Sequence, residues 1–194
     1  MPNKNCNNQN QNAWSEFSKK VNGVGGRGRI NSYGCISYTV DQWELVLDAY
    51  ALFRTVFNES HLLFDDCTRM QVYIDNRDAF TCEIYNSTFV SSIGKLLGMQ
   101  DIKIGDSSFD KKFIIKSNDK SKAIRLLHNN ELRTLMSSLP NFQIRINSKN
   151  RKMFSLHPEA YDEIVLEIDH YVTEFDVLYT MHKIIVTLLR CLYR

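Results

Sequence analysis

Three aspartates and two lysines lie close together in the middle of the chain, and these side chains are the strongest candidates for chemistry. Asp101, Asp106 and Asp110 fall within ten residues of one another, and Lys95 and Lys116 flank them. Clustered carboxylates can bind a hard cation or act as an acid–base pair, and lysines beside a turn or helix start can help to hold a phosphate. These five residues therefore form a candidate ligand-binding site.

The same carboxylates also have a structural interpretation, which the sequence favours. Aspartate beside glycine or serine is typical of turns, and Asp106 directly follows Gly105. A calcium loop places ligands at its first, third and fifth positions and a glycine at the sixth, and this spacing is not found here. We therefore predict turn and strand-end roles for most of them, with no metal and no cofactor.

The histidines and cysteines form no recognisable catalytic or ligand motif. The histidines show no HExxH spacing, and no GxSxG nucleophile motif accompanies them. The five cysteines are odd in number, widely spaced and without a CxxC pair, which is typical of reduced thiols. We predict no catalytic residue, so the sequence leaves enzyme activity open but favours its absence.

Charge and composition bear on the partners and the compartment. The net charge of +2 is too small to attract a polyanion through the field of the whole molecule. Arg27 and Arg29 lie in a glycine-rich stretch that is similar in composition to RNA-binding segments, but one such unit offers few phosphate contacts. Nucleic acid is thus not the expected partner. The N-terminus has no secretory apolar segment, so we expect a cytoplasmic protein.

The sequence also predicts that no segment spans a membrane. The longest apolar run near the C-terminus, residues 184–189, is interrupted by Arg190. A spanning helix needs about 20 mostly apolar residues. This run is therefore too short to cross.

The N-terminal 29 residues are expected to lie outside the folded domain. The first dozen are almost all Asn, Gln, Lys and Pro, and four glycines follow between residues 22 and 29. Such compositions bury too little apolar surface to fold, although residues 13–20 have the pattern of a short helix. We predict a disordered tail and flexible linker over residues 1–29 and a single domain over 30–194.

Apolar periodicity predicts the elements that must position the candidate residues. Alternation with a period of two predicts hairpins at 36–49, 70–85 and 142–156, and a further strand at 164–168. Helical spacing predicts two long amphipathic helices, at about 120–139 and 175–193. Because strands cluster in hairpins, we predict an α+β fold with a mainly antiparallel sheet and both helices packed on it.

The candidate site lies in a block of recognisable pattern. Residues 98–116 read G-x-QDI-x-IGD-x-x-FD-x-x-F-x-I-K, and a leucine-rich helical segment follows. This strand–turn–helix block resembles a family of uncharacterised bacterial proteins, a domain of unknown function. The resemblance implies a fold and a bacterial origin, and it carries over no catalytic or binding residue.

The final predicted helix is apolar over more than one face. Phe175, Tyr179 and Val186 lie off its main apolar stripe, and Leu192 lies at its end. Such a stripe is usually core, but a surplus of this kind can also bind a protein partner or a second copy of the chain. The sequence therefore favours a non-enzymatic protein-binding module that uses these four residues. The alternatives are a ligand-binding protein or enzyme with its site at the 94–120 turns and, less favoured, nucleic-acid contact through the glycine–arginine linker.

Overall fold

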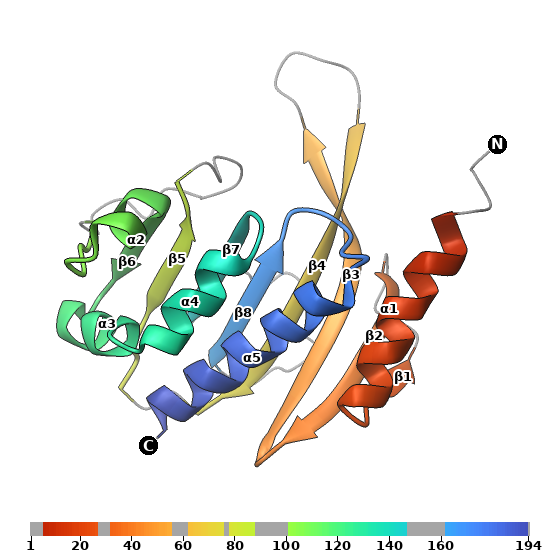
Figure 1. Cartoon of the computed structure of the whole chain (residues 1–194), viewed down its shortest axis with the longest axis horizontal. Coiled ribbons are helices and arrows are strands. Elements are labelled where there is room, and N and C mark those ends of the chain that lie inside the picture. Colours follow the sequence, from red (N-terminus) through yellow and green to blue (C-terminus); the bar gives the residue numbers. More distant parts are fainter. Residues whose placement is uncertain are drawn as a thin grey trace.

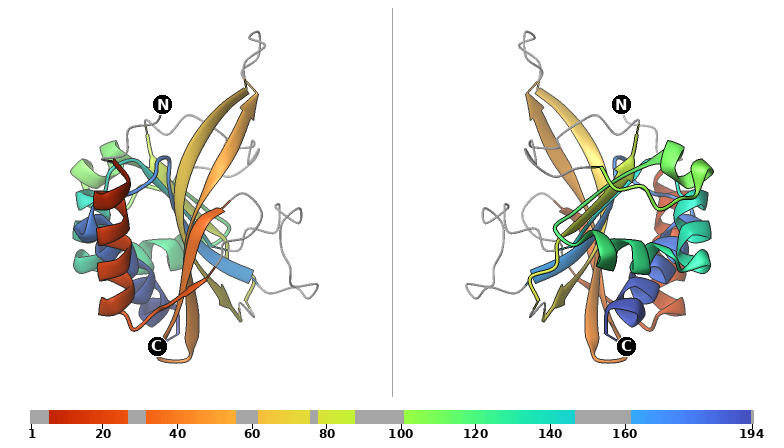
Figure 2. Two further views of the ribbon diagram at one scale, coloured as in Figure 1. Left: turned by 90° about the vertical axis from the view of Figure 1, so that its right-hand side faces the viewer. Right: turned by 90° about the vertical axis from the view of Figure 1, so that its left-hand side faces the viewer.

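The structure is a computed structural model that describes residues 6–26, 32–55, 62–75, 78–87, 101–146 and 162–193. The strands of these ranges form one antiparallel sheet in the order β1-β2-β3-β4-β8-β7-β5-β6. The helices lie on one face of this sheet, as Figure 1 shows, and the two layers are seen edge-on in Figure 2. The predicted α+β fold with an antiparallel sheet is confirmed.

The strands differ from the predicted hairpins in their partners. Their bounds are β1 Val24–Gly26, β2 Ser32–Val40, β3 Trp43–Thr55, β4 Leu62–Ile74, β5 Cys82–Asn86, β6 Phe113–Ser117, β7 Phe142–Ile146 and β8 Asp162–Ile168. β2 and β3 pair as the first predicted hairpin. The second hairpin is wrong, because β8 and β7 lie between β4 and β5. The second strand of the third, near residue 153, lies outside the described residues.

The helices are α1 Cys6–Lys20, α2 Ser107–Lys112, α3 Lys120–Leu127, α4 Asn130–Ser138 and α5 Phe175–Leu192. α5 has the predicted range, but the single long helix predicted at 120–139 is wrong. The chain turns at Asn129, whose side chain accepts a hydrogen bond from the Leu132 amide at 3.0 Å and starts α4 as a cap. Within the described ranges, no helix has the length and apolar character needed to cross a membrane.

The core lies between the helices and one face of the sheet. Alternate strand residues such as Leu45, Leu47 and Met70 are fully buried there, because side chains at positions two apart share one face. α5 runs diagonally over the middle of the sheet (Figure 1) and buries its apolar stripe completely from Leu178 to Leu189 at helical spacing. This packing is the main contact of the two layers.

Residues 13–26 of the N-terminal segment pack into this fold, and the short helix predicted over residues 13–20 lies within α1. Phe17 is completely buried, and the Trp14 indole donates a hydrogen bond to the Val172 carbonyl at 2.9 Å. β1 then pairs with β2 and forms one edge of the sheet. Three apolar residues, Ala13, Trp14 and Phe17, lie on one side of α1 and anchor it beside α5. Residues 1–5 and 27–31 lie outside the described part of the chain.

Candidate functional site

Asp106, one of the predicted ligand-binding residues, is the N-cap of α2. Its carboxylate accepts hydrogen bonds from the amides of Ser108 and Phe109, at 3.1 and 3.2 Å, and from the Ser108 hydroxyl at 2.7 Å. These bonds, led by the Ser108 side chain, hold the pKa of Asp106 below its usual value. Arg133 of α4 lies 3.6 Å away. Asp106 thus fixes a helix start, as a turn interpretation of the sequence predicts.

Asp110 closes the turn that precedes α2. Its two carboxylate oxygens accept hydrogen bonds from the amides of Ile104 and Gly105, at 3.0 and 3.1 Å. Gly105 has a φ of +88°, which is a conformation that residues with a side chain rarely adopt. Asp106 and Asp110 therefore bind separate sets of backbone amides.

Asp101 and Lys116 both act electrostatically on Tyr85 of β5. Burial raises the pKa of Tyr85, and the negative charge of Asp101 acts in the same direction, while the hydrogen-bonded Lys116 opposes it. Lys95 lies outside the described residues. In the part of the chain that the structure describes, no group of three or more His, Cys, Asp or Glu side chains is placed to hold a metal ion.

The predicted partner-binding residues of α5 separate into a seam with α1 and a groove at the helix end. Phe175 and Tyr179 stack at 5.6 Å between ring centroids, and Tyr179 stacks on His182 at 5.5 Å. The Lys20 ammonium of α1 lies 5.9 Å from the Tyr179 ring. Val186 is buried with 7% of its surface exposed, so it offers no surface to a partner. Part of the apolar surplus is thus used inside the molecule.

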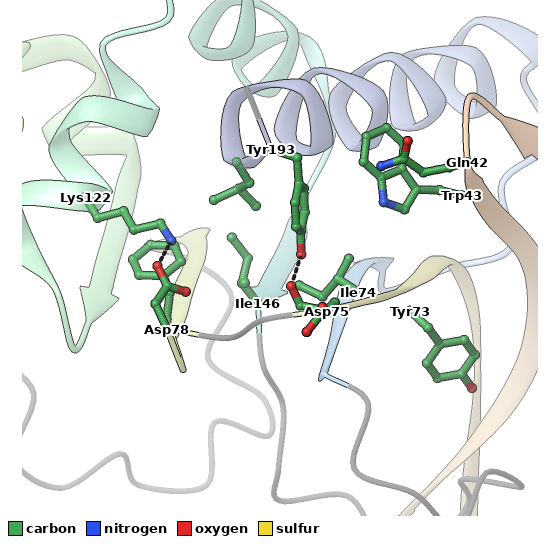
Figure 3. Close-up of a pocket in the computed structure, with 11 residues that line it drawn as sticks. Gln42, Trp43, Tyr73, Ile74, Asp75, Asp78, Lys122, Ile146 and Tyr193 are labelled. Atoms are coloured by element: carbon green, nitrogen blue, oxygen red, sulfur yellow. Dashed lines mark hydrogen bonds and ion pairs between the residues drawn. The ribbon is translucent and has the colours of Figure 1, made fainter.

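Leu192, the fourth predicted partner residue, lines an open groove at the C-terminal end of α5, which we call the α5 groove (Figure 3). Its volume is about 660 Å³. This lies within the range of about 300–1,000 Å³ that is usual for binding pockets. The lining comes from the β2–β3 turn, the end of β4, the segment before β5, α3, the end of β7 and the end of α5: Gln42, Trp43, Tyr73, Ile74, Asp75, Asp78, Phe80, Lys122, Ile146, Leu192 and Tyr193.

An aromatic pair forms one wall of the α5 groove. The rings of Trp43 and Tyr193 lie 5.6 Å apart at an angle of 48°, and the Tyr193 hydroxyl donates a hydrogen bond to the Asp75 carbonyl at 2.9 Å. Tyr193 is 39% exposed. Among the side chains that the structure describes, it and Val24 are the large hydrophobic residues that are exposed. Within the described part of the chain, the most exposed aromatic side chain therefore lies in this groove.

The opposite wall of the α5 groove carries charge. Lys122 of α3 forms an ion pair with Asp78, and its ammonium lies 4.6 Å from the centre of the Phe80 ring (Figure 3). The hydrogen bond from Lys122 lowers the pKa of Asp78. Asp162 stands opposite Ile74 in the β4–β8 ladder, so its side chain points to the same face as the groove-lining Ile74. The wall thus combines aliphatic, aromatic and ionic groups.

These carboxylates act together on the tyrosine at the end of α5. Burial, and to a lesser degree the negative charges of Asp75, Asp78 and Asp162, together raise the pKa of Tyr193 to about 12. All three carboxylates therefore lie within electrostatic reach of the Tyr193 hydroxyl. Lys122 is the cation that lines the groove among the described residues.

The sheet face opposite the helices carries buried charges that the sequence analysis did not single out. Arg69 binds both oxygens of Asp48, at 2.9 and 2.5 Å. Glu167 accepts hydrogen bonds from Tyr50 at 2.9 Å and from Arg145 at 3.2 Å. Asp48, Glu167 and Arg145 are at most 9% exposed. These pairs join β3, β4, β8 and β7 and have a structural role, because the charges of each pair cancel.

Sequence reasoning missed most of the α5 groove because its parts are far apart in the chain. Lys122 and Asp78 are separated by 44 positions, and Tyr193 and Asp75 by 118. Only Leu192 was singled out, through the helical period of α5. A usable signal was the aromatic residue that follows Leu192, since tyrosine at the end of an apolar stripe is typical of interfaces.

No family model matches the chain, and no curated protein or solved structure matches it either. The resemblance to a family of uncharacterised bacterial proteins stays a prediction. The candidate function therefore depends on the geometry of the molecule.

Proposed function

We propose that the protein is a non-enzymatic binding module of a bacterial cytoplasm, which takes a segment of a partner protein into the α5 groove. The observation that carries this proposal is the aromatic pair of the exposed Tyr193 and the partly buried Trp43, which lines the groove together with the aliphatic residues Ile74, Ile146 and Leu192. Tryptophan and tyrosine are enriched among the residues that dominate binding energy at protein interfaces. An open groove of this kind suits an extended segment.

In this proposed function α5 still binds the partner protein, but it does so with the residues at its C-terminal end. The α1-side seam of α5 is partly covered within the molecule, whereas Leu192 and Tyr193 face the groove. The alternative ligand site at the 94–120 turns has less support, since Asp106 and Asp110 are bonded to local amides. Arg27 and Arg29, on which nucleic-acid contact would depend, lie outside the described residues.

A peptide selection tests this function. A library of random displayed peptides is selected against the wild-type chain, and the recovered peptides are compared on Tyr193→Ala and on Val24→Ala. Val24 is the matched control because it is also an exposed large hydrophobic residue, on β1. We expect recovered peptides to lose about tenfold or more in affinity for Tyr193→Ala, as is usual for an interface hot spot, and to keep their affinity for Val24→Ala.

Two results would contradict the proposed function. One is a selection that recovers no binder above background. The other is a set of binders whose affinity is the same for the wild type and Tyr193→Ala, because such peptides bind elsewhere on the molecule.

A further inference from the structure

We infer that the partner segment bound by the α5 groove contains proline and lies there as a polyproline II helix. This inference rests on the proposed function and names the chemistry and conformation of its partner. It is carried by the side chains of Trp43 and Tyr193, which lie next to each other at the C-terminal end of α5 (Figure 3). Together they offer apolar ring surface and an indole N–H donor to a bound segment.

The two tryptophans of the chain differ in how their indole N–H groups are used. The Trp14 indole donates to the Val172 carbonyl at 2.9 Å and so fixes α1 to the segment before α5. The Trp43 ring contacts the Tyr193 ring, and its N–H donates to none of the residues that the structure describes. An indole N–H can only donate, and a backbone carbonyl of a bound segment is a suitable acceptor for it.

Tyr193 supplies apolar surface beside this donor. Its hydroxyl donates to the Asp75 carbonyl at 2.9 Å, which holds the ring in one position, and the residue is 39% exposed. The side chains of Ile74 and Ile146, which line the same groove, are at most 3% exposed and therefore form a firm apolar surface. Grooves that bind proline-rich segments are lined by aromatic side chains in the same way.

The place of the groove in the sheet argues against a bound β-strand. The strands that contribute to its lining, β3, β4 and β7, each have a hydrogen-bonded neighbour on both sides. A strand that adds to a sheet needs an open edge with unpaired backbone groups. These strands offer no such edge, so a partner segment binds here through its side chains and single carbonyl groups.

The indole donor separates a polyproline II helix from an α-helix. An α-helix uses its interior carbonyl groups for its own hydrogen bonds, whereas a polyproline II helix has no internal hydrogen bonds and leaves its carbonyl groups available. Proline also fixes φ near about −65°, so the segment loses little conformational freedom on binding. A donor beside apolar rings therefore fits this conformation better than the other two.

The indole N–H groups provide a direct test, because each tryptophan gives its own signal in a proton–nitrogen correlation spectrum. The two signals are assigned with Trp14→Phe and Trp43→Phe. The full chain is then titrated with an oligoproline peptide of about ten residues, or with a flexible glycine–serine peptide of equal length as the control. We expect oligoproline to shift the Trp43 signal and leave the Trp14 signal in place, and the glycine–serine peptide to shift neither.

The peptides recovered by selection against the wild-type chain give a second measurement. Among those that depend on Tyr193, we expect proline to be enriched. Replacement of a proline by alanine should weaken binding about two- to fivefold, because the free peptide becomes more flexible. Trp43→Phe should weaken binding about fivefold, as is usual for the loss of one hydrogen bond. Trp14→Phe is the matched control, since this indole lies outside the α5 groove.

The outcomes separate this inference from the proposed function. Peptides that depend on Tyr193 but bind equally with alanine in place of proline would overturn the inference and leave the function standing. So would an oligoproline titration that leaves the Trp43 signal in place, or an equal shift with the glycine–serine peptide. A selection without peptides that depend on Tyr193 overturns both.

Discussion

His182 is the residue whose protonation should make stability depend on pH. Its Nδ1 lies 3.0 Å from the Tyr38 hydroxyl, and its ring packs edge-to-face with the Phe17 ring. Burial lowers the pKa of His182 from 6.5 to about 4, and the positive charges of Arg190 and Lys183 act in the same direction. The folded chain therefore holds the ring neutral where the unfolded chain would protonate it.

The sign of the effect follows from proton linkage. Between the folded pKa of about 4 and the unfolded value of 6.5, the unfolded state binds the extra proton, so acidification favours unfolding. The contribution is complete above about pH 6.5 and is lost as the pH falls towards 4. Urea unfolding at about pH 7 and about pH 4.5 should show a larger loss of stability for the wild type than for His182→Gln. Parallel losses in both proteins would show that another group causes the change.

Glu167 is the residue at which a buried charge can be tested most directly. It accepts hydrogen bonds from Tyr50 and Arg145, and it is only 4% exposed. Glu167→Gln keeps the shape of the side chain but leaves the Arg145 guanidinium without its counter-charge. We expect a loss of about 3 kcal/mol in the free energy of unfolding, the usual effect of breaking a buried ion pair.

The control for Glu167→Gln is an exposed ion pair of the same molecule. Asp41 and Arg190 are 3.7 Å apart, and both side chains are 53% exposed. Asp41→Asn should cost less than about 1 kcal/mol, because water screens and solvates both charges. Chemical unfolding of both variants gives the comparison. Equal losses would mean that the Glu167–Arg145 pair is as well hydrated as the surface pair.

At the scale of elements, the connection from α1 to β1 depends on a close approach at Gly23. A side-chain carbon added there would lie 2.5 Å from Ile36 Cγ2 of β2, whereas one added at Gly25 meets nothing within 4 Å. Gly23→Ala should therefore lower the free energy of unfolding by about 1–3 kcal/mol through overpacking. Gly25→Ala is the control and should change it by less than about 1 kcal/mol.

Thermal unfolding of both glycine variants decides whether the N-terminal segment is packed as described. A lowered melting temperature for Gly23→Ala alone agrees with a tight contact between the turn and β2. Identical melting temperatures for the two variants would mean that this turn can move away from Ile36 at no cost.

The division between α3 and α4 shows where periodicity alone leads to error. Leu126, Leu127, Leu132 and Met136 continue one helical pattern across residues 128 and 129, so a single helix is the simplest prediction. The chain instead turns at Asn129, which caps α4. α4 then makes its main helix contact with α5. A capping residue inside a helical pattern is a weak local signal, and packing against another element decides whether it is used.

At the scale of the whole molecule, residues near both ends of the described chain share one core. Phe17 of α1 contacts Tyr38 of β2 and His182 of α5, with ring centroids 5.7 and 6.2 Å apart. α1 thus completes the helical layer and should unfold together with the sheet. This expectation differs from the sequence-based prediction that the domain begins at residue 30.

The two tryptophans can show whether α1 and the sheet unfold together, because one lies on α1 and the other in the sheet. Trp14 lies on α1 and stacks on Tyr171, and Trp43 begins β3. In Trp43→Phe, the fluorescence of Trp14 should follow the same urea transition as far-UV circular dichroism, because a single cooperative unit gives coincident transitions. Trp14→Phe is the matched control, in which the fluorescence of Trp43 reports on the unfolding of the sheet. A Trp14 transition at lower urea than the dichroism transition would show that α1 detaches first.

Local pattern in the sequence was enough to determine α5, the β2–β3 hairpin, the turn role of Asp106, and the fold class. Each depends on contacts between residues near one another in the chain, such as helical spacing, period-two alternation and a capping carboxylate. Only the tertiary structure decided the strand order, the packing of α1 and the α5 groove. The groove joins Trp43, Asp78, Lys122 and Tyr193, which come from four separate segments, and such long-range contacts leave no periodic trace in a single sequence.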